Sequence, residues 1–423
     1  MPTLRSLNAM EVLDSRGRPT VAARCMLEDG AAGEASVPSG ASTGTAEALE
    51  LRDGDPKRYR GLGCRKAVEN VRGEMNAKLS GKEFATQAEF DRALIELDGT
   101  PNKSRLGANA ILAASIAFAR ACGVERGVPL FAQFGELLDR EPDSLPRPTI
   151  NLFSGGKHAG GQVCIQDVLI VPASARTMDE ALAMSYAVYQ AAAERIQRIY
   201  KERALGADEG GLAPRFPNVE AMLEDAVESI RAAGLTPGHD VSIAIDVAST
   251  QFYANGVYEI DGAQLDSAGM LARVAGWVER YPIVSVEDAL FEEDWAHWPA
   301  LRAKLEAKAL VLGDDFLCTN PERIRRAAKE KACNALLLKV NQIGTLSEAA
   351  ESCRLARAAG WKVTVSARSG ETEDYWLADL AVGWGGDQIK IGSITRSERL
   401  AKYNRLLAIE AGTHLPLRAW PNG

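Results

Sequence analysis

Two kinds of hydrophobic pattern divide the chain. In the first part, the apolar segments 19–26 and 33–38 are typical of strands on either side of a turn at Asp29-Gly30. Three segments with helical spacing follow, at 66–79, 86–97 and 108–121. A polar stretch with three prolines, 138–148, has the composition of a linker. We therefore expect a separate α+β domain over residues 1–137.

Beyond the linker, short apolar runs recur with helical segments between them. Eight runs predict strands, at 149–153, 167–171, 241–247, 283–286, 310–313, 335–340, 362–366 and 388–391. One helical segment carries apolar side chains from Leu182 to Tyr200 at helical spacing, and it starts at a capping box of Thr177 and Glu180. Strands alternating with helices predict an α/β barrel over residues 138–423. We expect it to be irregular, because its first strands follow one another without a full helix between them.

The composition narrows the class of protein. Apolar residues make up 46% and charged residues 25%, a mix typical of globular proteins. The net charge of −8 disfavours a nucleic acid or an anionic membrane as partner, and we expect no run long enough to span a membrane. The seven cysteines are scattered and form no CxxC pair. They favour a reduced, cytoplasmic protein without a disulfide framework.

Polar residues recur where the predicted barrel strands end. They are Asp246, Glu287, Asp314, Lys339, Ser366 and Lys390. Positions 287, 314, 339, 366 and 390 are 27, 25, 27 and 24 residues apart, which is the length of one βα unit. Any one of these charges could be no more than the first solvated residue after a strand. A periodic series of three acids and two lysines instead favours an active site at the carboxyl ends of the strands.

The residue types in this series suit one kind of chemistry. The carboxylates of Asp246, Glu287 and Asp314 would hold a hard cation such as Mg²⁺ better than zinc, and there are only four histidines to favour zinc. Lysine acts as a general base only when neutral. We expect burial, with Lys390 or the metal nearby, to lower the pKa of Lys339 from its usual value of about 10.4. The metal would stabilise the enolate formed when a proton leaves the carbon next to a carboxylate.

Long stretches of the sequence resemble the enolase family, from about residue 11 to about residue 410. These stretches are DSRGRPTV (14–21), VPSGASTG (37–44), LDGTPNKSRLGANAIL (97–112), SGGKHAGG (154–161), ADEGGLAP (207–214), YPIVSVED (281–288), LLLKVNQIGTLSE (336–348), SARSGETED (366–374), IKIG (389–392) and TRSERLAK (395–402). The resemblance implies an enolase-type irregular eight-stranded α/β barrel with an N-terminal α+β capping domain. It also implies two Mg²⁺ ions per active site, a small phosphorylated carboxylic acid as substrate, and a homo-oligomer, either a dimer or an octamer. The implied reaction removes the C2 proton of 2-phosphoglycerate and then the C3 hydroxyl.

The resemblance also implies roles for individual residues. The metal ligands are Asp246, Glu287 and Asp314 for the first ion and Ser42 for the second. The catalytic residues are the base Lys339 and the acids Glu209 and Asp167. The substrate-binding residues are His158, Gln166, Ser366, Arg368, Ser369, Lys390 and Ser42. Some of them also have plain structural readings: Ser42 as a turn residue, Gln166 as a packed amide, His158 as a structural imidazole and Arg368 as the partner of a carboxylate.

Three departures from the family pattern bear on function. Asp167 stands where enolases have Glu, Ala367 stands where they have His, and the tail 411–423 lacks the usual ending. Our preferred hypothesis is a diverged paralogue that keeps enolate chemistry, such as carboxyphosphonoenolpyruvate synthase of phosphinate antibiotic biosynthesis. The alternatives are a housekeeping glycolytic enolase and an inactive enolase-fold binding protein. A nicotinamide enzyme is disfavoured, because no GxGxxG fingerprint follows a strand.

Overall fold

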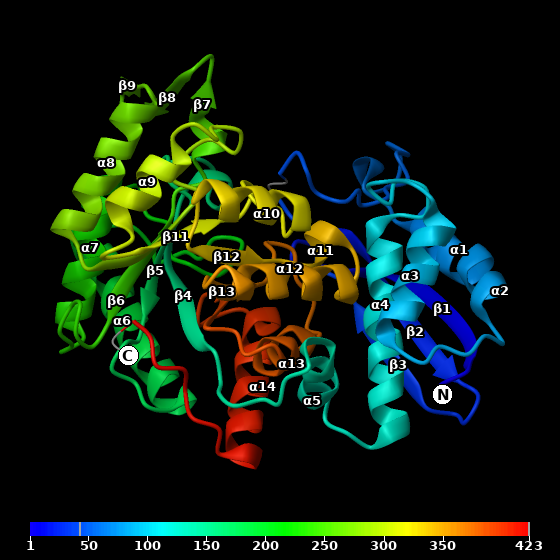
Figure 1. Cartoon of the computed structure of the whole chain (residues 1–423). Helices are drawn as coiled ribbons and strands as arrows, with labels where there is room; N and C mark the ends of the chain where they lie inside the picture. The colour runs from blue at the N-terminus through cyan, green and yellow to red at the C-terminus, as the bar shows by residue number, and fades with distance from the viewer. Residues whose placement is uncertain (42–43, 422–423) are drawn as a thin grey trace.

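The computed structural model describes residues 1–41 and 44–421, in which an N-terminal domain packs against a barrel (Figure 1). The N-terminal domain has one antiparallel sheet in the order β1 (Leu4–Leu13), β2 (Pro19–Leu27), β3 (Ala32–Ser36). Its helices are α1 (Arg65–Asn70), α2 (Asn76–Leu79), α3 (Gln87–Asp98), α4 (Ala108–Arg126) and α5 (Leu130–Gly135). A π-helical turn, Val71–Met75, joins α1 to α2. The sequence pattern predicted β2, β3 and the helical segments that correspond to α1 with α2, α3 and α4, but it did not predict β1 or α5.

Helix α4 is the centre of the N-terminal domain. By length and composition alone it could cross a membrane, contrary to our expectation that no segment would, but 83% of the relevant window is buried inside the protein. The sheet approaches it closely at Gly33, where an added Cβ would lie 2.3 Å from the Ala117 carbonyl oxygen. The apolar length of α4 is therefore explained by packing within the domain.

Eight strands form the closed barrel. They are β4 (Arg147–Ser154), β5 (Asp167–Val171), β6 (Ser242–Asp246), β10 (Ile283–Glu287), β11 (Leu310–Gly313), β12 (Ala335–Leu338), β13 (Lys362–Ser366) and β14 (Gln388–Gly392). Strand β5 runs antiparallel to both β4 and β6, and the other neighbouring pairs are parallel. The expected irregular eight-stranded barrel is therefore confirmed. Strand β4 begins at Arg147, so the last two residues of the predicted linker belong to the barrel.

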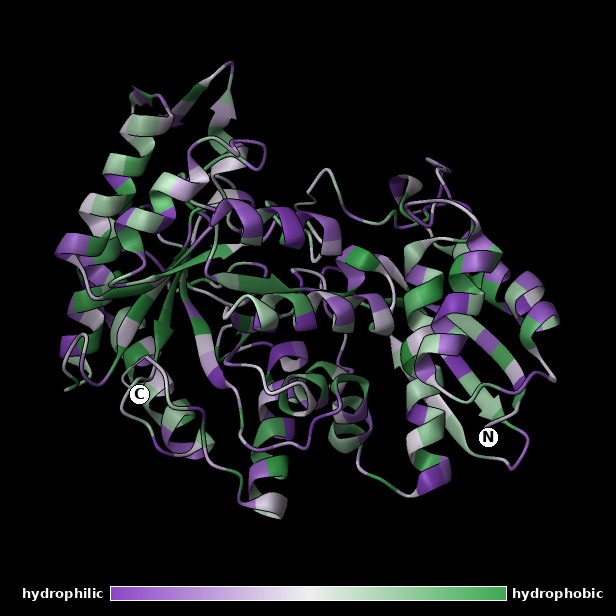
Figure 2. Cartoon of the chain, in the orientation of Figure 1, coloured by the Kyte–Doolittle hydropathy of each residue, from purple (hydrophilic) through white to green (hydrophobic). Residues whose placement is uncertain are grey.

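Helices surround the barrel between its strands. They are α6 (Met178–Arg195), α7 (Val219–Ala232), α8 (Ser267–Arg280), α9 (Trp298–Leu305), α10 (Pro321–Glu330), α11 (Val340–Ile343), α12 (Leu346–Ala358), α13 (Trp376–Gly383) and α14 (Ser397–Thr413). The predicted capping box begins α6, where the Thr177 side chain accepts a hydrogen bond from the Glu180 amide at 3.1 Å. A small sheet of β7 (Tyr253–Ala254), β8 (Val257–Ile260) and β9 (Ala263–Leu265) precedes α8. Figure 2 shows mainly hydrophobic barrel strands and mixed outer helices.

The segment after α14 packs beneath the barrel. Trp420 is buried in a cluster with Leu169, Val171 and Ala244, which are barrel-strand residues. The Leu145 amide donates to the Pro416 carbonyl at 2.8 Å, just before β4 begins. The tail that departs from the family's usual ending therefore contributes to the packing of this barrel.

The N-terminal domain is joined to the loop that follows β13. Ser39 and Gly370 exchange two backbone hydrogen bonds, at 2.8 and 3.0 Å. The Arg16 guanidinium donates to the Ser369 hydroxyl at 3.1 Å. Gly370 has no room for a side chain, because an added Cβ would lie 2.2 Å from Arg16 and from Asp14. The two domains thus meet at the residues predicted to bind phosphate.

Candidate active site

The polar series predicted at the strand ends converges on one rim of the barrel. Asp246, Glu287 and Ser366 are the last residues of β6, β10 and β13, and Asp314 and Lys339 directly follow β11 and β12. Lys390 lies within β14. Because β5 runs in the opposite direction, its first residue reaches the same rim. There Asp167 pairs with Asp246 in one sheet ladder and with Ser154 in the other.

Lys390 lies between two of the predicted metal ligands. Its Nζ is 2.7 Å from Asp246 Oδ2 and 2.7 Å from Glu287 Oε2, and all three side chains are buried. Burial lowers the pKa of Lys390, but the attraction of both carboxylates outweighs it and raises that pKa well above its usual value. Burial, together with repulsion from Asp246, raises the pKa of Glu287 well above the ordinary range. The carboxylates of Asp246 and Glu287 thus repel each other, and a positive charge between them stabilises their ionised forms.

Lys339 forms an ion pair with the third predicted ligand, Asp314. The other Asp314 oxygen accepts a hydrogen bond from Gln342 Nε2 at 2.8 Å. Burial lowers the pKa of Lys339, but the attraction of Asp314 outweighs it, so that pKa is raised. Burial and Lys390 act on the Lys339 pKa in the expected direction, but the attraction of the carboxylates outweighs them and the net shift in this arrangement is upward.

A second polar group lies at the start of β5. The His158 ring directs Nδ1 to Asp167 Oδ2 at 2.9 Å and Nε2 to Glu209 Oε1 at 3.8 Å. The remaining oxygen of Asp167 accepts from the Ser154 hydroxyl at 2.7 Å, and that of Glu209 accepts from Asn151 Nδ2 at 3.1 Å. Burial lowers the pKa of His158, but Asp167 and Glu209 outweigh it and raise that pKa to about 9. These contacts bring the three predicted residues together.

Two predicted substrate-binding residues contact other parts of the protein. Gln166 Nε2 donates to Asp246 Oδ2 at 3.1 Å, so the amide packs against a predicted metal ligand. The Ser366 hydroxyl donates to the Ala367 carbonyl at 3.0 Å. Each contact gives the side chain a structural partner within the protein. Ser42, predicted as a ligand of the second metal, lies outside the described residues.

Arg368 connects the barrel to the N-terminal domain. Its guanidinium donates to both carboxylate oxygens of Glu47, at 3.0 and 3.2 Å, and to Asn341 Oδ1 at 3.0 Å. Burial lowers the pKa of Arg368, but Glu47 outweighs it and the pKa is raised. The neighbouring Ser369 hydroxyl accepts from Arg16. The predicted phosphate-binding pair is thus held by two side chains from the other domain.

Several residues of the site were not predicted from the sequence. The Asp288 carboxylate accepts from the backbone amides of Asp314 and Asp315, at 2.8 and 2.7 Å. Burial, together with repulsion from Asp314, raises the pKa of Asp315 to about 7. The paired acids at 287–288 and 314–315 were a visible signal for both. Asn151 and Gln342 gave no such signal, because their partners are distant in sequence.

Two groups in the described part of the chain could hold a metal ion with ligand atoms within 4.8 Å of one another. They are His158, Asp167 and Glu209, and Asp288, Asp314 and Asp315. In the described part of the chain, the ligand atoms of the predicted trio Asp246, Glu287 and Asp314 do not all lie within 4.8 Å of one another. The Lys390 ammonium contacts the first two of these, whereas Asp314 contacts Lys339 and Gln342.

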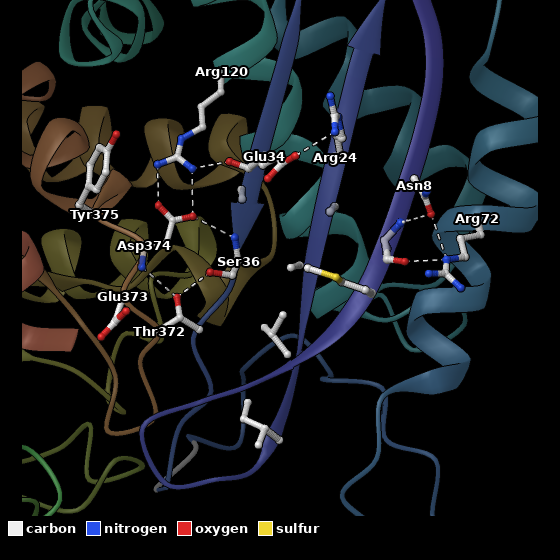
Figure 3. Close-up of a pocket in the computed structure, with 17 residues that line it drawn as sticks. Asn8, Arg24, Glu34, Ser36, Arg72, Arg120, Thr372, Glu373, Asp374 and Tyr375 are labelled. Carbon is white, nitrogen blue, oxygen red and sulfur yellow. Dashed lines mark hydrogen bonds and ion pairs between the residues drawn. The ribbon is translucent and has the colours of Figure 1, made fainter. Parts of the chain in front are cut away.

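A groove of about 700 Å³ lies elsewhere, on the outer face of the N-terminal sheet (Figure 3). It is lined by residues of β1, β2 and β3 and by the segment 372–375. Met10, Leu13 and Tyr375 expose apolar side chains there. None of the predicted site residues lines this groove, so its size does not mark the chemical site.

Comparison with known families agrees with this arrangement. The chain matches the family model described as "Enolase, N-terminal domain" over residues 4–134. It matches "Enolase, C-terminal TIM barrel domain" over residues 142–414. The chain belongs to the enolase family. The capping domain and closed barrel are those expected of an enolase, and the matches support an enolase-superfamily enzyme. The boundary after residue 137 stays a prediction.

Proposed function

We propose that this enolase-family protein is a magnesium-dependent enzyme that removes the C2 proton of 2-phosphoglycerate or a close analogue, giving a phosphoenolpyruvate-type product. The observation that carries the proposal is the rim of the barrel. Asp246, Glu287 and Asp314 lie there with Lys339 and Lys390, at the ends of neighbouring strands. Barrel enzymes use this end of the fold for chemistry.

The donor set fits magnesium. Asp246, Glu287 and Asp314 offer carboxylate oxygens, the ligand type that Mg²⁺ prefers. Burial and repulsion from Asp246 raise the pKa of Glu287 because both disfavour the charged carboxylate. A cation bound between the carboxylates would offset this effect. When bound, the ion would supply positive charge that stabilises the enolate. Ser42 is the proposed ligand of a second ion.

The residues of the chain have separate proposed tasks. Lys339 takes the C2 proton, which requires its ammonium to lose a proton first. The contact with Asp314 raises the pKa of Lys339, so losing that contact would make deprotonation of the Lys339 ammonium easier. Lys390 pairs with the substrate carboxylate, and Arg368 with Ser369 binds the phosphate. Glu209 faces the C3 hydroxyl on the opposite side of the site.

Two substitutions support a diverged paralogue over a housekeeping enzyme. Ala367 removes an imidazole, and Asp167 has one methylene fewer than the usual Glu. The proposed base and metal ligands are retained, whereas the side that handles the leaving group is smaller. We therefore propose a substrate modified in that region, as for carboxyphosphonoenolpyruvate synthase. A glycolytic enolase is the second candidate, since every proposed ligand and base in the described chain is retained. That retention also argues against an inactive binding protein.

The deciding experiment is a magnesium-dependent assay with 2-phosphoglycerate beside an ordinary enolase, following the conjugated product by ultraviolet absorbance. Little turnover with magnesium bound would support the paralogue and direct the search to phosphonate and phosphinate analogues. Comparable turnover would support the glycolytic enzyme. Failure to bind magnesium in calorimetry would contradict both and favour a binding protein. The homo-oligomer stays a prediction, which sedimentation velocity tests.

A further inference from the structure

The motif TRSERLAK, residues 395–402, leads into α14 and contains none of the residues given a task in the proposed reaction. Two of its cations, Arg399 and Lys402, lie on the same face of the helix because they are three positions apart. Both side chains are buried against the loop that follows β13. Lys402 Nζ donates to the Thr372 carbonyl at 2.8 Å and lies 3.0 Å from Glu371 Oε2. The motif therefore holds this loop from the barrel side.

The Arg399 guanidinium donates its hydrogen bonds to main-chain oxygens. One terminal nitrogen donates to the Arg368 carbonyl at 2.6 Å and to the Ile391 carbonyl at 3.0 Å. The other donates to the Ser369 carbonyl at 2.6 Å. Its Nε lies 3.3 Å from Glu398 Oε1, which gives an ion pair within the first turn of the helix. Because Arg368 and Ser369 are the proposed phosphate-binding pair, Arg399 contacts the main chain of both.

These hydrogen bonds set the direction of two peptide groups. In a planar trans peptide, the carbonyl oxygen and the following N–H point in opposite directions. The peptide between Ser369 and Gly370 is held at both ends, because its N–H donates to the Ser39 carbonyl at 3.0 Å. The peptide between Arg368 and Ser369 is held at its oxygen, and no acceptor for the Ser369 N–H lies in the described part of the chain. Arg399 thus draws two negative peptide ends toward α14 and directs the Ser369 N–H away from it.

Building on the proposed function, we propose that Arg399 is a positioning residue for the phosphate-binding pair. Its guanidinium holds two carbonyl oxygens away from the substrate phosphoryl group and so fixes where Arg368 and Ser369 present their donors. Carbonyl oxygens turned toward that group would repel it, because both carry negative charge. Arg399 thereby sets the affinity for the phosphoryl group, whereas the step in which Lys339 takes the C2 proton does not depend on it.

A second buried arginine supplies the matched control. Arg147 is 3% exposed and begins β4, at the end of the barrel opposite the rim. It also donates to three main-chain oxygens, at 2.5, 3.1 and 2.9 Å, which belong to Pro172, Ala175 and Arg418. Replacing Arg147 with methionine therefore removes the same kind of buried contacts without touching the phosphate-binding pair.

The test measures anion affinity and proton removal separately. Arg399→Met, Arg399→Lys and Arg147→Met are titrated with inorganic phosphate, without magnesium, by phosphorus-31 NMR, and C2 exchange of 2-phosphoglycerate is followed by proton NMR in D2O. We expect Arg399→Met to weaken phosphate binding about tenfold or more and to raise KM by a similar factor, because both carbonyls lose their donors. The maximal rate of C2 exchange should change less than about threefold, as when binding alone is lost. Arg399→Lys keeps the charge without the planar fork and should recover part of the affinity.

Arg147→Met should lower the melting temperature, as Arg399→Met does, but leave phosphate affinity unchanged. An Arg399→Met variant that binds phosphate as tightly as Arg147→Met would overturn the inference, and so would a parallel fall in the maximal rate of C2 exchange. Should Arg399→Met fail to fold, unchanged phosphate affinity in both Arg399→Lys and Arg399→Gln would overturn it instead.

The outcomes for the unmodified protein separate this inference from the proposed reaction. Binding of phosphate without C2 exchange would contradict the reaction, and the phosphate affinities of the variants would still decide the role of Arg399. Failure to bind phosphate at all would contradict the phosphate-binding pair and, with it, the positioning role.

Discussion

Replacing Lys390 with methionine should destabilise the barrel in a way that magnesium reverses. The ammonium group lies 2.7 Å from both Asp246 and Glu287, and all three side chains are buried. Methionine keeps a long apolar stem but leaves two buried carboxylates without their cation. Removing one partner of a buried ion pair costs about 3–5 kcal/mol. For a barrel domain of about 270 residues this corresponds to a fall in melting temperature of about 5–9 °C.

The assay is thermal unfolding, followed by circular dichroism, with a chelator and again with saturating Mg²⁺. Magnesium should restore most of the loss, because a cation bound by the carboxylates stabilises the native state by mass action. The matched control is Lys402→Met. Lys402 is also buried and lies 3.0 Å from Glu371, but it contacts none of the proposed ligands. The Lys402→Met variant should lose stability, and magnesium should not restore its melting temperature. The reasoning fails if magnesium raises the melting temperature of Lys390→Met no more than that of Lys402→Met.

Four further predictions test other parts of the molecule. Lys339→Ala should abolish C2 proton exchange while calorimetry still detects magnesium binding; surviving exchange would remove Lys339 from the role of base. Ala367→His should raise dehydration of 2-phosphoglycerate severalfold, and an unchanged rate would mean that the pocket diverged elsewhere. Gly33→Ala should lower the free energy of unfolding in urea by about 1–3 kcal/mol, because the new methyl group meets the backbone of α4; full stability would show that the strand can shift. Pairing raises the pKa of His158 from 6.5 to about 9, so the stability it contributes is complete below pH 6.5 and is lost as the pH rises to 9. The difference in unfolding free energy between the unmodified protein and His158→Gln, up to about 3 kcal/mol, should shrink across that window, and a constant difference would contradict the raised value.

The barrel strands could be predicted from the sequence because each is a short apolar run followed by a polar residue. The direction of β5 could not, since an apolar run reads the same for parallel and antiparallel strands. That direction matters for the site, because it brings the first residue of β5, Asp167, to the rim. Strand β1 was missed because several of its positions are exposed or half-exposed, including Met10 and Leu13.

The candidate site was predictable in its residue types but not in its pairing. The spacing of acids and lysines along the chain predicted that they converge. It carried no information on which lysine meets which acid, and so the raised pKa of Lys339 beside Asp314 was not expected. The same holds for Glu47, which reaches Arg368 across 321 positions of sequence. Such contacts depend on how the two domains dock.

The exchange of hydrogen bonds between Ser39 and Gly370 has a consequence for how this enzyme can change over generations. The loop that carries Arg368 and Ser369 is shaped by side chains of both domains. Variation at Arg16 or Glu47 can therefore alter how Arg368 and Ser369 are held while Asp246, Glu287, Asp314 and Lys339, which all lie in the barrel, stay untouched. With the roles proposed for these residues, changes at Arg16 or Glu47 would alter the substrate range of a lineage while the barrel residues proposed for proton removal are kept.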